Sequence, residues 1–342
     1  MHTLARLTCA ASALALVGLA GSAILSTPAA AQQADFPSRT VEIVVGRTAG
    51  GGIDQHARAV APYMQRHLPG DASVIVTNRP GAGGVIALMS VWDGAADGYR
   101  ITKTITSTDV INAIINDEVG YTLSEFDFLG SLYYADTGLM VRADLGWQTI
   151  DDMRAAGQQE PIIFGTTGVG STAHIEGAFV YGQHLGVPVR FVHYPGNSDV
   201  MLAMARGEVH ATSFGVNTAA GFAEAEENLE MLLVWSREPV EFFEDLPTAL
   251  DAGITEEEFD SAPAVLGQWR ALMVAPNTPE PVLEILREAF VAAMDDPEYD
   301  AWRINASLPK RVVVGDDFAE IVRSIEEGYM AFADELKEML QQ

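Results

Sequence analysis

Two glycine-rich stretches decide how this chain folds: Thr48-Ala-Gly-Gly-Gly-Ile-Asp54 and Gly165-Thr-Thr-Gly-Val-Gly-Ser-Thr172. The first follows a strand-like run, Val41–Val45, and the second follows Pro161–Phe164. Each precedes a run with helical spacing. Glycine lets the backbone approach a ligand closely, and the N–H groups of a first helical turn have no partner within their helix. The pattern therefore predicts two anion-binding turns, one in each of two similar lobes.

Residues 1–31 have the composition of a secretory signal peptide. Arg6 precedes an apolar run from Leu7 to Leu25, and Ala29–Ala31 offers a cleavage site. An uncleaved membrane anchor is the alternative, but no stop-transfer pattern follows. We expect an exported, periplasmic protein that is cleaved near Ala31. Its single cysteine, Cys9, lies within the signal, so the mature chain has no disulfide and no thiolate.

The charge balance is strongly acidic. The chain has 20 Lys and Arg residues against 47 Asp and Glu, a net charge of −27. Because no basic stripe is available to displace counterions, we expect no nucleic-acid partner. The acidic surface indicates adaptation to a saline periplasm or, alternatively, an ordinary acidic exported protein.

Strand-like and helix-like segments alternate, which is typical of an α/β protein with mostly parallel sheets. Strands are expected at Val41–Val45, Ser73–Thr77, Arg100–Thr106, Phe126–Leu132, Leu139–Arg142, Ile162–Gly165, Val189–His193, Ala211–Phe214, Met231–Trp235 and Trp269–Ala275. Helices are expected at Ala173–Leu185, at Asp199–Arg206, from Pro279 to Met294, and from Asp316 or Asp317 to Leu340.

The helix after the first turn carries His56. Apolar residues from Ile53 to Leu68 recur on it at helical spacing and predict one buried face. No His-Glu-x-x-His spacing accompanies His56 or His67, so we expect both to be exposed or capping residues and not metal ligands.

The last part of the chain has one strand and too few helices for a domain of its own. It is expected to complete the first lobe, with residues 35–133 and 246–342 in lobe I and residues 134–245 in lobe II. The chain would cross between the lobes near 131–138 and 236–247. Two such crossings form a hinge that lets the lobes close around a ligand.

No single motif is specific. The first turn lacks the spacing of a dinucleotide fingerprint, and Ser171 stands where a phosphate-binding loop has lysine, so each turn could also be a tight connection without a ligand. Ser107 and Thr108 could face the cleft or cap a helix. Tyr194 and Asn217 follow strands of lobe II, where open α/β sheets bind ligands. The absence of a nucleophile elbow, a zincin motif and a cysteine predicts no catalytic residue, metal or cofactor.

In their order along the chain, these residues resemble the periplasmic substrate-binding receptors of tripartite tricarboxylate transporters, the Bug or TctC-like family. The resemblance is carried by Ala49–Asp54, Asn78–Gly84, Asp97–Tyr99, Gly168–Thr172 and Met273–Pro279. It implies a two-lobed type II periplasmic-binding fold (a Venus flytrap) with two mixed, mostly parallel sheets. It also implies that the protein is not an enzyme, and that it delivers a small carboxylate ligand to cognate membrane permease subunits. We expect a monomer.

The resemblance further implies backbone and hydroxyl contacts to a carboxylate from Ala49–Gly52, Asp54, Thr166, Thr167 and Gly170–Thr172. Two departures from the family pattern occur, at Gly46-Arg47-Thr48 and at Phe214–Asn217, so the identity of the ligand cannot be transferred. We hypothesise that Arg47 pairs with a ligand carboxylate; a surface pair with a nearby acid is the alternative. The predicted ligand-binding residues are Arg47, Thr48, Ala49, Gly50, Gly51, Gly52, Asp54, Ser107, Thr108, Thr166, Thr167, Gly170, Ser171, Thr172, Tyr194 and Asn217.

Two other functions fit the sequence. One is an exported enzyme that acts on a small organic acid. The other is a periplasmic sensory module that docks on a membrane kinase in place of a permease.

Overall fold

The computed structural model describes residues 36–340 except 48, 51, 117 and 263–266. The predictions for the signal peptide, Thr48 and Gly51 lie outside the described residues. Within the described part of the chain, no helix combines the length and apolarity needed to cross a membrane.

The first lobe is built on a five-stranded sheet with the strand order β2–β1–β3–β10–β4. Its strands are β1 (Val41–Val45), β2 (Val74–Asn78), β3 (Arg100–Ile105), β4 (Asp127–Ala135) and β10 (Gln268–Val274). Strand β1 pairs parallel with β2 and β3, whereas β10 runs antiparallel between β3 and β4. A strand from the end of the chain thus lies inside the sheet formed by its beginning.

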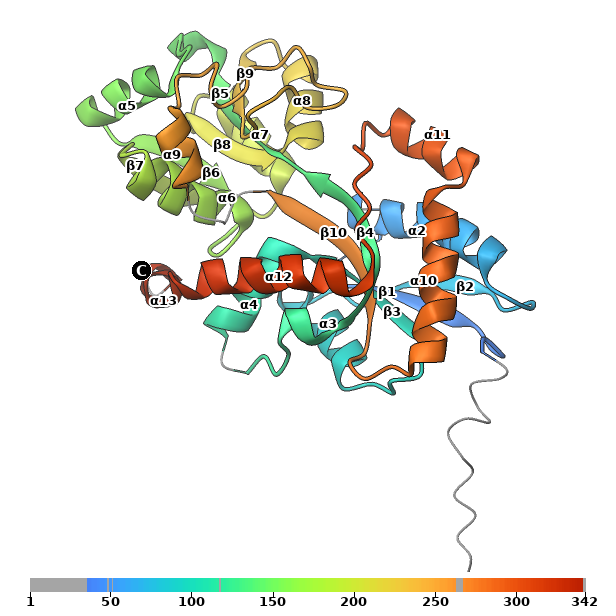
Figure 1. The fold of residues 1–342 in the computed structure, drawn as a ribbon. Helices are drawn as coiled ribbons and strands as arrows, with labels where there is room; N and C mark the ends of the chain where they lie inside the picture. The colour runs from blue at the N-terminus through green and yellow to red at the C-terminus, as the bar shows by residue number, and fades with distance from the viewer. Residues whose placement is uncertain (1–35, 48, 51, 117, 263–266, 341–342) are drawn as a thin grey trace, which may run out of the picture.

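The helices of this lobe cover both faces of the sheet (Figure 1). They are α2 (Gly52–His67), α3 (Val85–Trp92), α4 (Thr106–Ile115), α10 (Glu280–Met294), α11 (Pro297–Asn305), α12 (Gly315–Met330) and α13 (Ala333–Leu340). Helices α2 and α10 pack together over one face, and α4 packs with α12 over the other. The apolar spacing of α2 explains its position, since Ala57, Val60 and Met64 are fully buried or nearly so.

The second lobe repeats this plan with the strand order β7–β6–β8–β5–β9. Its strands are β5 (Thr137–Arg142), β6 (Ile162–Thr166), β7 (Val189–His193), β8 (Ala211–Gly215) and β9 (Leu229–Val234). Its helices are α5 (Ile150–Gln159), α6 (Thr172–Ile175), a π-helix (Glu176–His184), α7 (Asn197–Ala205), α8 (Val216–Ala225) and α9 (Glu256–Asp260). Two mixed sheets, each with its own helices, confirm the predicted two-lobed α/β fold.

The chain crosses between the sheets twice. Only Asp136 separates β4 from β5, and this crossing lies inside the predicted range. After β9 the chain stays with the second sheet: Thr248 bridges to Val234, and Phe259 stacks on Trp235 with ring centroids 5.4 Å apart. We therefore propose that lobe II extends to about residue 260 and not only to 245.

Two helices differ from their predicted form. The helix predicted at Ala173–Leu185 begins as α6 and continues as the π-helix. The last predicted helix is divided into α12 and α13 between Met330 and Ala333. This division turns α13 towards lobe II. There the ring of Phe332 packs against that of Phe179 of the π-helix, with ring centroids 5.6 Å apart.

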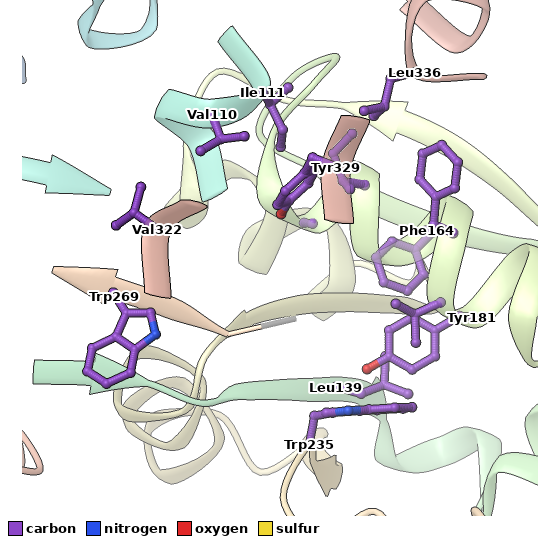
Figure 2. Packing of buried hydrophobic residues seen from close by; sticks show 14 of the residues in the cluster. Val110, Ile111, Leu139, Phe164, Tyr181, Trp235, Trp269, Val322, Tyr329 and Leu336 are labelled. Atoms are coloured by element: carbon purple, nitrogen blue, oxygen red, sulfur yellow. The ribbon is translucent and has the colours of Figure 1, made fainter. Parts of the chain in front are cut away.

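One apolar cluster joins both lobes along this side of the molecule. Figure 2 shows Tyr329 and Leu336, from the C-terminal helices, beside Phe164 and Tyr181 of lobe II. These four side chains are almost wholly buried. The C-terminal helices thus pack against both lobes.

Candidate functional site

The two lobes enclose a cleft of about 900 Å³ at the carboxyl ends of their central strands. First-turn residues of helices from both lobes line it: Ile53 and Gln55 of α2, Thr108 of α4, Thr172 of α6, Asn197 of α7 and Asn217 of α8. A helix N-terminus carries roughly half a positive charge and several free N–H groups. The cleft is therefore a positive region bounded by helix ends.

The side chains of the cleft reinforce this charge. Among its described lining residues there is no Asp or Glu, whereas Arg47 and Arg270 are both present. In a chain with 47 acidic residues, the absence of carboxylates from the described lining of this cleft indicates a site for an anion.

Asp54 orders the first glycine turn. It is buried, and its Oδ2 accepts hydrogen bonds from the Gly50 N–H at 2.8 Å and from Arg58 Nε at 3.0 Å. Its Oδ1 accepts from Asn78 Nδ2 at 2.8 Å. These contacts, the Arg58 bond foremost, lower the pKa of Asp54 to about 2. The carboxylate is thus engaged inside the turn, and so is the Gly50 N–H that was expected to face a ligand.

His174 has the corresponding role in the second turn. Its Nδ1 accepts a hydrogen bond from the Gly170 N–H at 3.1 Å, which requires a neutral imidazole with its proton on Nε2. Burial, and then the neighbouring His193, lower the pKa of His174 to about 4. Thr166 is fully buried, and its hydroxyl oxygen lies 2.5 Å from Nδ1 of His193. Ser171 caps the helix by accepting from the His174 N–H.

The two lobes approach each other at this turn. The hydroxyl oxygens of Thr108 in lobe I and Thr172 in lobe II are 3.5 Å apart across the cleft. Both residues occupy the first turn of a helix. A small ligand at this point is within reach of donors from both lobes.

The structure brings part of the predicted set into the cleft lining: Arg47, Thr108, Thr167, Gly170, Ser171, Thr172 and Asn217. Ala49 and Gly50 are exposed in the first turn, and Gly52 begins α2. The side chains of Asp54 and Thr166 are buried and form hydrogen bonds within lobe I and lobe II, respectively.

Two predicted residues lie elsewhere. Ser107 lines a separate cavity of about 290 Å³ together with Trp269 and Tyr329. Tyr194 packs against the apolar cluster of lobe II, and its N–H donates to the Thr166 carbonyl at 2.8 Å. The residues that follow Tyr194, from Pro195 to Asn197, reach the cleft in its place.

His56 was predicted to be exposed or capping, and this was wrong. It is 2% exposed and stacks on Tyr133 with ring centroids 4.8 Å apart, while its Nε2 lies 2.7 Å from the Tyr299 hydroxyl. Burial holds the pKa of His56 well below its usual value. A signal was available, because His56 is three residues after Ile53 and four before Val60 and so shares their apolar face.

The cleft contains further residues that the sequence analysis did not identify, chiefly Tyr133, Gln268 and Arg270. They come from β4 and β10, whose pairing joins distant parts of the chain. No group of three His, Cys, Asp or Glu side chains is arranged to hold a metal ion in the described ranges.

Comparison with known proteins identifies the family. The model of the tripartite tricarboxylate transporter family receptor, TctC, matches residues 56–320. A Cupriavidus necator protein, the UPF0065 protein in the gbd 5′ region, is 30% identical over 303 residues, which cover 87% of this chain and 86% of that protein.

Solved structures agree with this match. A TctC solute-binding protein from Polaromonas superimposes with a TM-score of 0.72 at 27% identity, covering 88% of this chain and 98% of that one. R. palustris Rpa4515, solved with adipate, superimposes with a TM-score of 0.70 at 22% identity, covering 90% and 99%. The chain therefore belongs to the tripartite tricarboxylate transporter family receptors, which are periplasmic substrate-binding proteins and not enzymes.

Proposed function

We propose that this protein is a periplasmic receptor that binds a small carboxylate between its lobes and delivers it to a tripartite tricarboxylate transporter permease. The observation that carries the proposal is the charge of the cleft. Helix N-termini from both lobes and two arginines line it, and no described lining residue is acidic. A carboxylate ligand would supply the missing negative charge.

The energetics favour binding by both lobes together. A hydrogen bond to a charged group contributes about 1.5–3 kcal/mol, and a helix N-terminus adds about 0.3–1 kcal/mol, up to about 2 when it is partly buried. Micromolar affinity requires about 8 kcal/mol after the cost of ordering the ligand and the lobes. Contacts from one turn alone fall short of this sum. Contacts from both lobes, which approach each other at Thr108 and Thr172, can supply this free energy. Ligand binding is therefore coupled to closure of the lobes.

Arg47 is the predicted site residue best placed to add a charged contact. Its guanidinium lies in the cleft lining, where it donates at 3.2 Å to the neighbouring Gly46 carbonyl, and no described acidic group forms an ion pair with it. Burial raises the pKa of the Asp109 carboxyl, and the charge of Arg47 does act against this rise, so the binding experiment on Arg47→Ala separates the two proposed roles of Arg47. R. palustris Rpa4515, which shares this fold, was solved with adipate, and this is consistent with a carboxylate ligand.

Calorimetry and mass spectrometry on the mature protein test the proposal. Titration with mono-, di- and tricarboxylates should give saturable binding of at least one class, and the ligand should be recovered unchanged after long incubation. Failure to bind any carboxylate would contradict the proposed ligand class, and conversion of the ligand would contradict the role of receptor.

Delivery requires a separate experiment. Proteoliposomes that contain the cognate permease should take up the bound carboxylate only when this protein is added. Uptake that is independent of the receptor would contradict delivery. Size-exclusion chromatography with light scattering tests the expected monomer, and N-terminal sequencing of the exported protein tests cleavage near Ala31.

A further inference from the structure

A cluster of basic side chains lies in the wall of lobe I, apart from the two glycine turns. In the antiparallel pairing of β10 with its neighbours, Arg270 is opposite Ile105 of β3 and opposite Tyr133 of β4, while Lys103 is opposite Leu272. Residues opposite each other, or two apart on one strand, share a face of the sheet. Arg270, Lys103 and Tyr133 therefore lie on the same face, beneath α2.

Contacts around Tyr133 show how tightly the cluster is assembled. The Lys103 Nζ lies 5.8 Å and the Arg270 Cζ 6.0 Å from the centroid of its ring. His56 of α2 stacks on the same ring. Arg270, Tyr133 and His56 line the cleft, and Lys103 completes the cluster behind them.

These basic groups are buried without enough partners. Lys103 is 3% exposed and Arg270 is 9% exposed. The Lys103 Nζ, the Arg270 Nε and the His56 Nδ1 have no hydrogen-bond partner among the described residues. Arg270 does donate to its neighbours, the Gln268 side chain and the Trp269 carbonyl, but neither partner carries a charge.

A buried acid of the same lobe, Asp109, is hydrogen-bonded to other groups. Asp109 accepts through Oδ2 from the Thr104 hydroxyl at 2.7 Å and from the Ile105 N–H at 2.8 Å, and it forms no ion pair with Arg270 or Lys103 among the described contacts. Burial raises the pKa of Asp109, and the charges of Arg47 and Arg270 act against this rise without a direct ion pair. A buried cation without a counter-ion is costly, and burial together with Arg270 lowers the pKa of Lys103 well below its usual value. An incoming anion would remove this cost.

We propose that Arg270, supported by Lys103 and His56, forms a second anion subsite, and that the ligand is a dicarboxylate whose far carboxylate occupies it. This inference rests on the proposed function, because it assumes that the first carboxylate binds at the glycine turn of lobe II. Arg270 and that turn belong to opposite lobes and line one cleft. A ligand with a carboxylate at each end gains the contact with Arg270 in addition to those at the glycine turn, and a monocarboxylate lacks it.

The test compares acids of equal length that differ in one carboxylate: butyrate with succinate, and hexanoate with adipate. In calorimetry, wild-type protein should bind the diacid of the preferred pair at least tenfold more tightly than the monoacid. Arg270→Gln should weaken diacid binding at least tenfold and monoacid binding less than threefold. Arg270→Lys, which keeps the charge, should recover part of the diacid affinity.

Arg287→Gln is the matched control. This arginine is also mostly buried, bonds to the Phe128 carbonyl at 3.1 Å, and lies outside the cleft lining. Its replacement should change neither affinity more than twofold. If Arg270→Gln fails to fold, the wild-type comparison and Lys103→Met, expected to weaken diacid binding selectively, still decide the question.

Two results are distinguished. If wild-type protein binds monoacid and diacid within threefold of each other, or if Arg270→Gln weakens both equally, the second subsite is wrong and the carboxylate receptor stands. If no carboxylate binds at all, the proposed function itself is wrong.

Discussion

Replacement of Asp54 with asparagine tests whether the first glycine turn is held by a buried carboxylate. In the native turn the two carboxylate oxygens accept from three donors: the Gly50 N–H, Asn78 Nδ2 and Arg58 Nε. Asparagine has nearly the same shape but only one oxygen. Its amide nitrogen would face at least one of these donors, so one charge-assisted hydrogen bond is lost outright and the others lose the charge.

The expected cost follows from these contacts. A hydrogen bond to a charged group contributes about 1.5–3 kcal/mol. The Arg58 ion pair adds little, because the arginine side chain is 49% exposed and its charge is screened. We expect Asp54→Asn to lower the free energy of unfolding by about 2–4 kcal/mol. With an unfolding entropy of roughly 2 cal/mol/K per residue, this corresponds to a loss of roughly 3–6 °C in Tm for a chain of this size.

Differential scanning calorimetry at pH 7 provides the measurement. Arg58→Gln, which removes only the exposed partner, is the control and should lower Tm by less than about 2 °C. A Tm for Asp54→Asn within 1 °C of wild type would refute the reasoning.

The pH dependence gives a second check on Asp54. Its pKa is lowered from 3.8 to about 2 in the folded protein, chiefly by Arg58. The folded state therefore binds the proton more weakly than the unfolded state. The stabilisation is fully present above about pH 4 and is lost as the pH falls through about 2. The Tm difference between wild type and Asp54→Asn should narrow over that interval.

Three other predictions concern the cleft and the joint between the lobes. Arg47→Ala should weaken carboxylate binding about tenfold in calorimetry with little change in Tm. The control Arg39→Ala, which removes an exposed ion pair with Asp97, should change neither the affinity nor the Tm. An unchanged affinity of Arg47→Ala would show that Arg47 does not belong to the site. The pKa of His174 is lowered to about 4 and its neutral Nδ1 accepts from Gly170, so this stabilisation is present above about pH 6.5 and is lost as the pH falls towards 4. The fall in Tm over that range should be smaller in His174→Asn, and an equal fall in both proteins would contradict the assignment. Phe179→Ala should lower the unfolding free energy by about 3–5 kcal/mol in urea titrations, because this side chain is 2% exposed and its ring packs against Phe332 between α12 and α13. A loss below about 1 kcal/mol would show that this contact does not stabilise lobe II.

Local patterns in the sequence were sufficient for the frame of the cleft. Both glycine turns follow the strands predicted for them, because short apolar runs and turn glycines act within a few residues. The same locality explains why Asp54 was expected to contact the ligand. Its contact with Asn78 depends on how β2 lies beside the turn, which no spacing within the turn records. The contact with Arg58, four residues later on α2, does follow from the sequence spacing.

The basic wall of lobe I could not be predicted in this way. Arg270 reaches the cleft because β10 inserts between β3 and β4, so its neighbours Ile105 and Tyr133 are more than 100 residues away in the chain. A partial signal was present at Lys103, one of three lysines in the chain, which stands in the middle of a predicted strand. A charged residue in a central strand is unusual, and it indicates either an edge position or a buried function.

The distribution of charge also determines how such a receptor can select its ligand. A protein of net charge −27 repels a dianion at long range, and salt shortens this repulsion to about 10 Å at 0.1 M. Capture must therefore depend on groups that act within the cleft. Helix N-termini and arginines satisfy this condition, because their interactions strengthen as water is excluded. The groups in the cleft do not help an acidic site elsewhere on the surface to attract the anion. The separation of charge that slows the approach of the anion thus favours its binding in the cleft, whose described lining residues include no carboxylate.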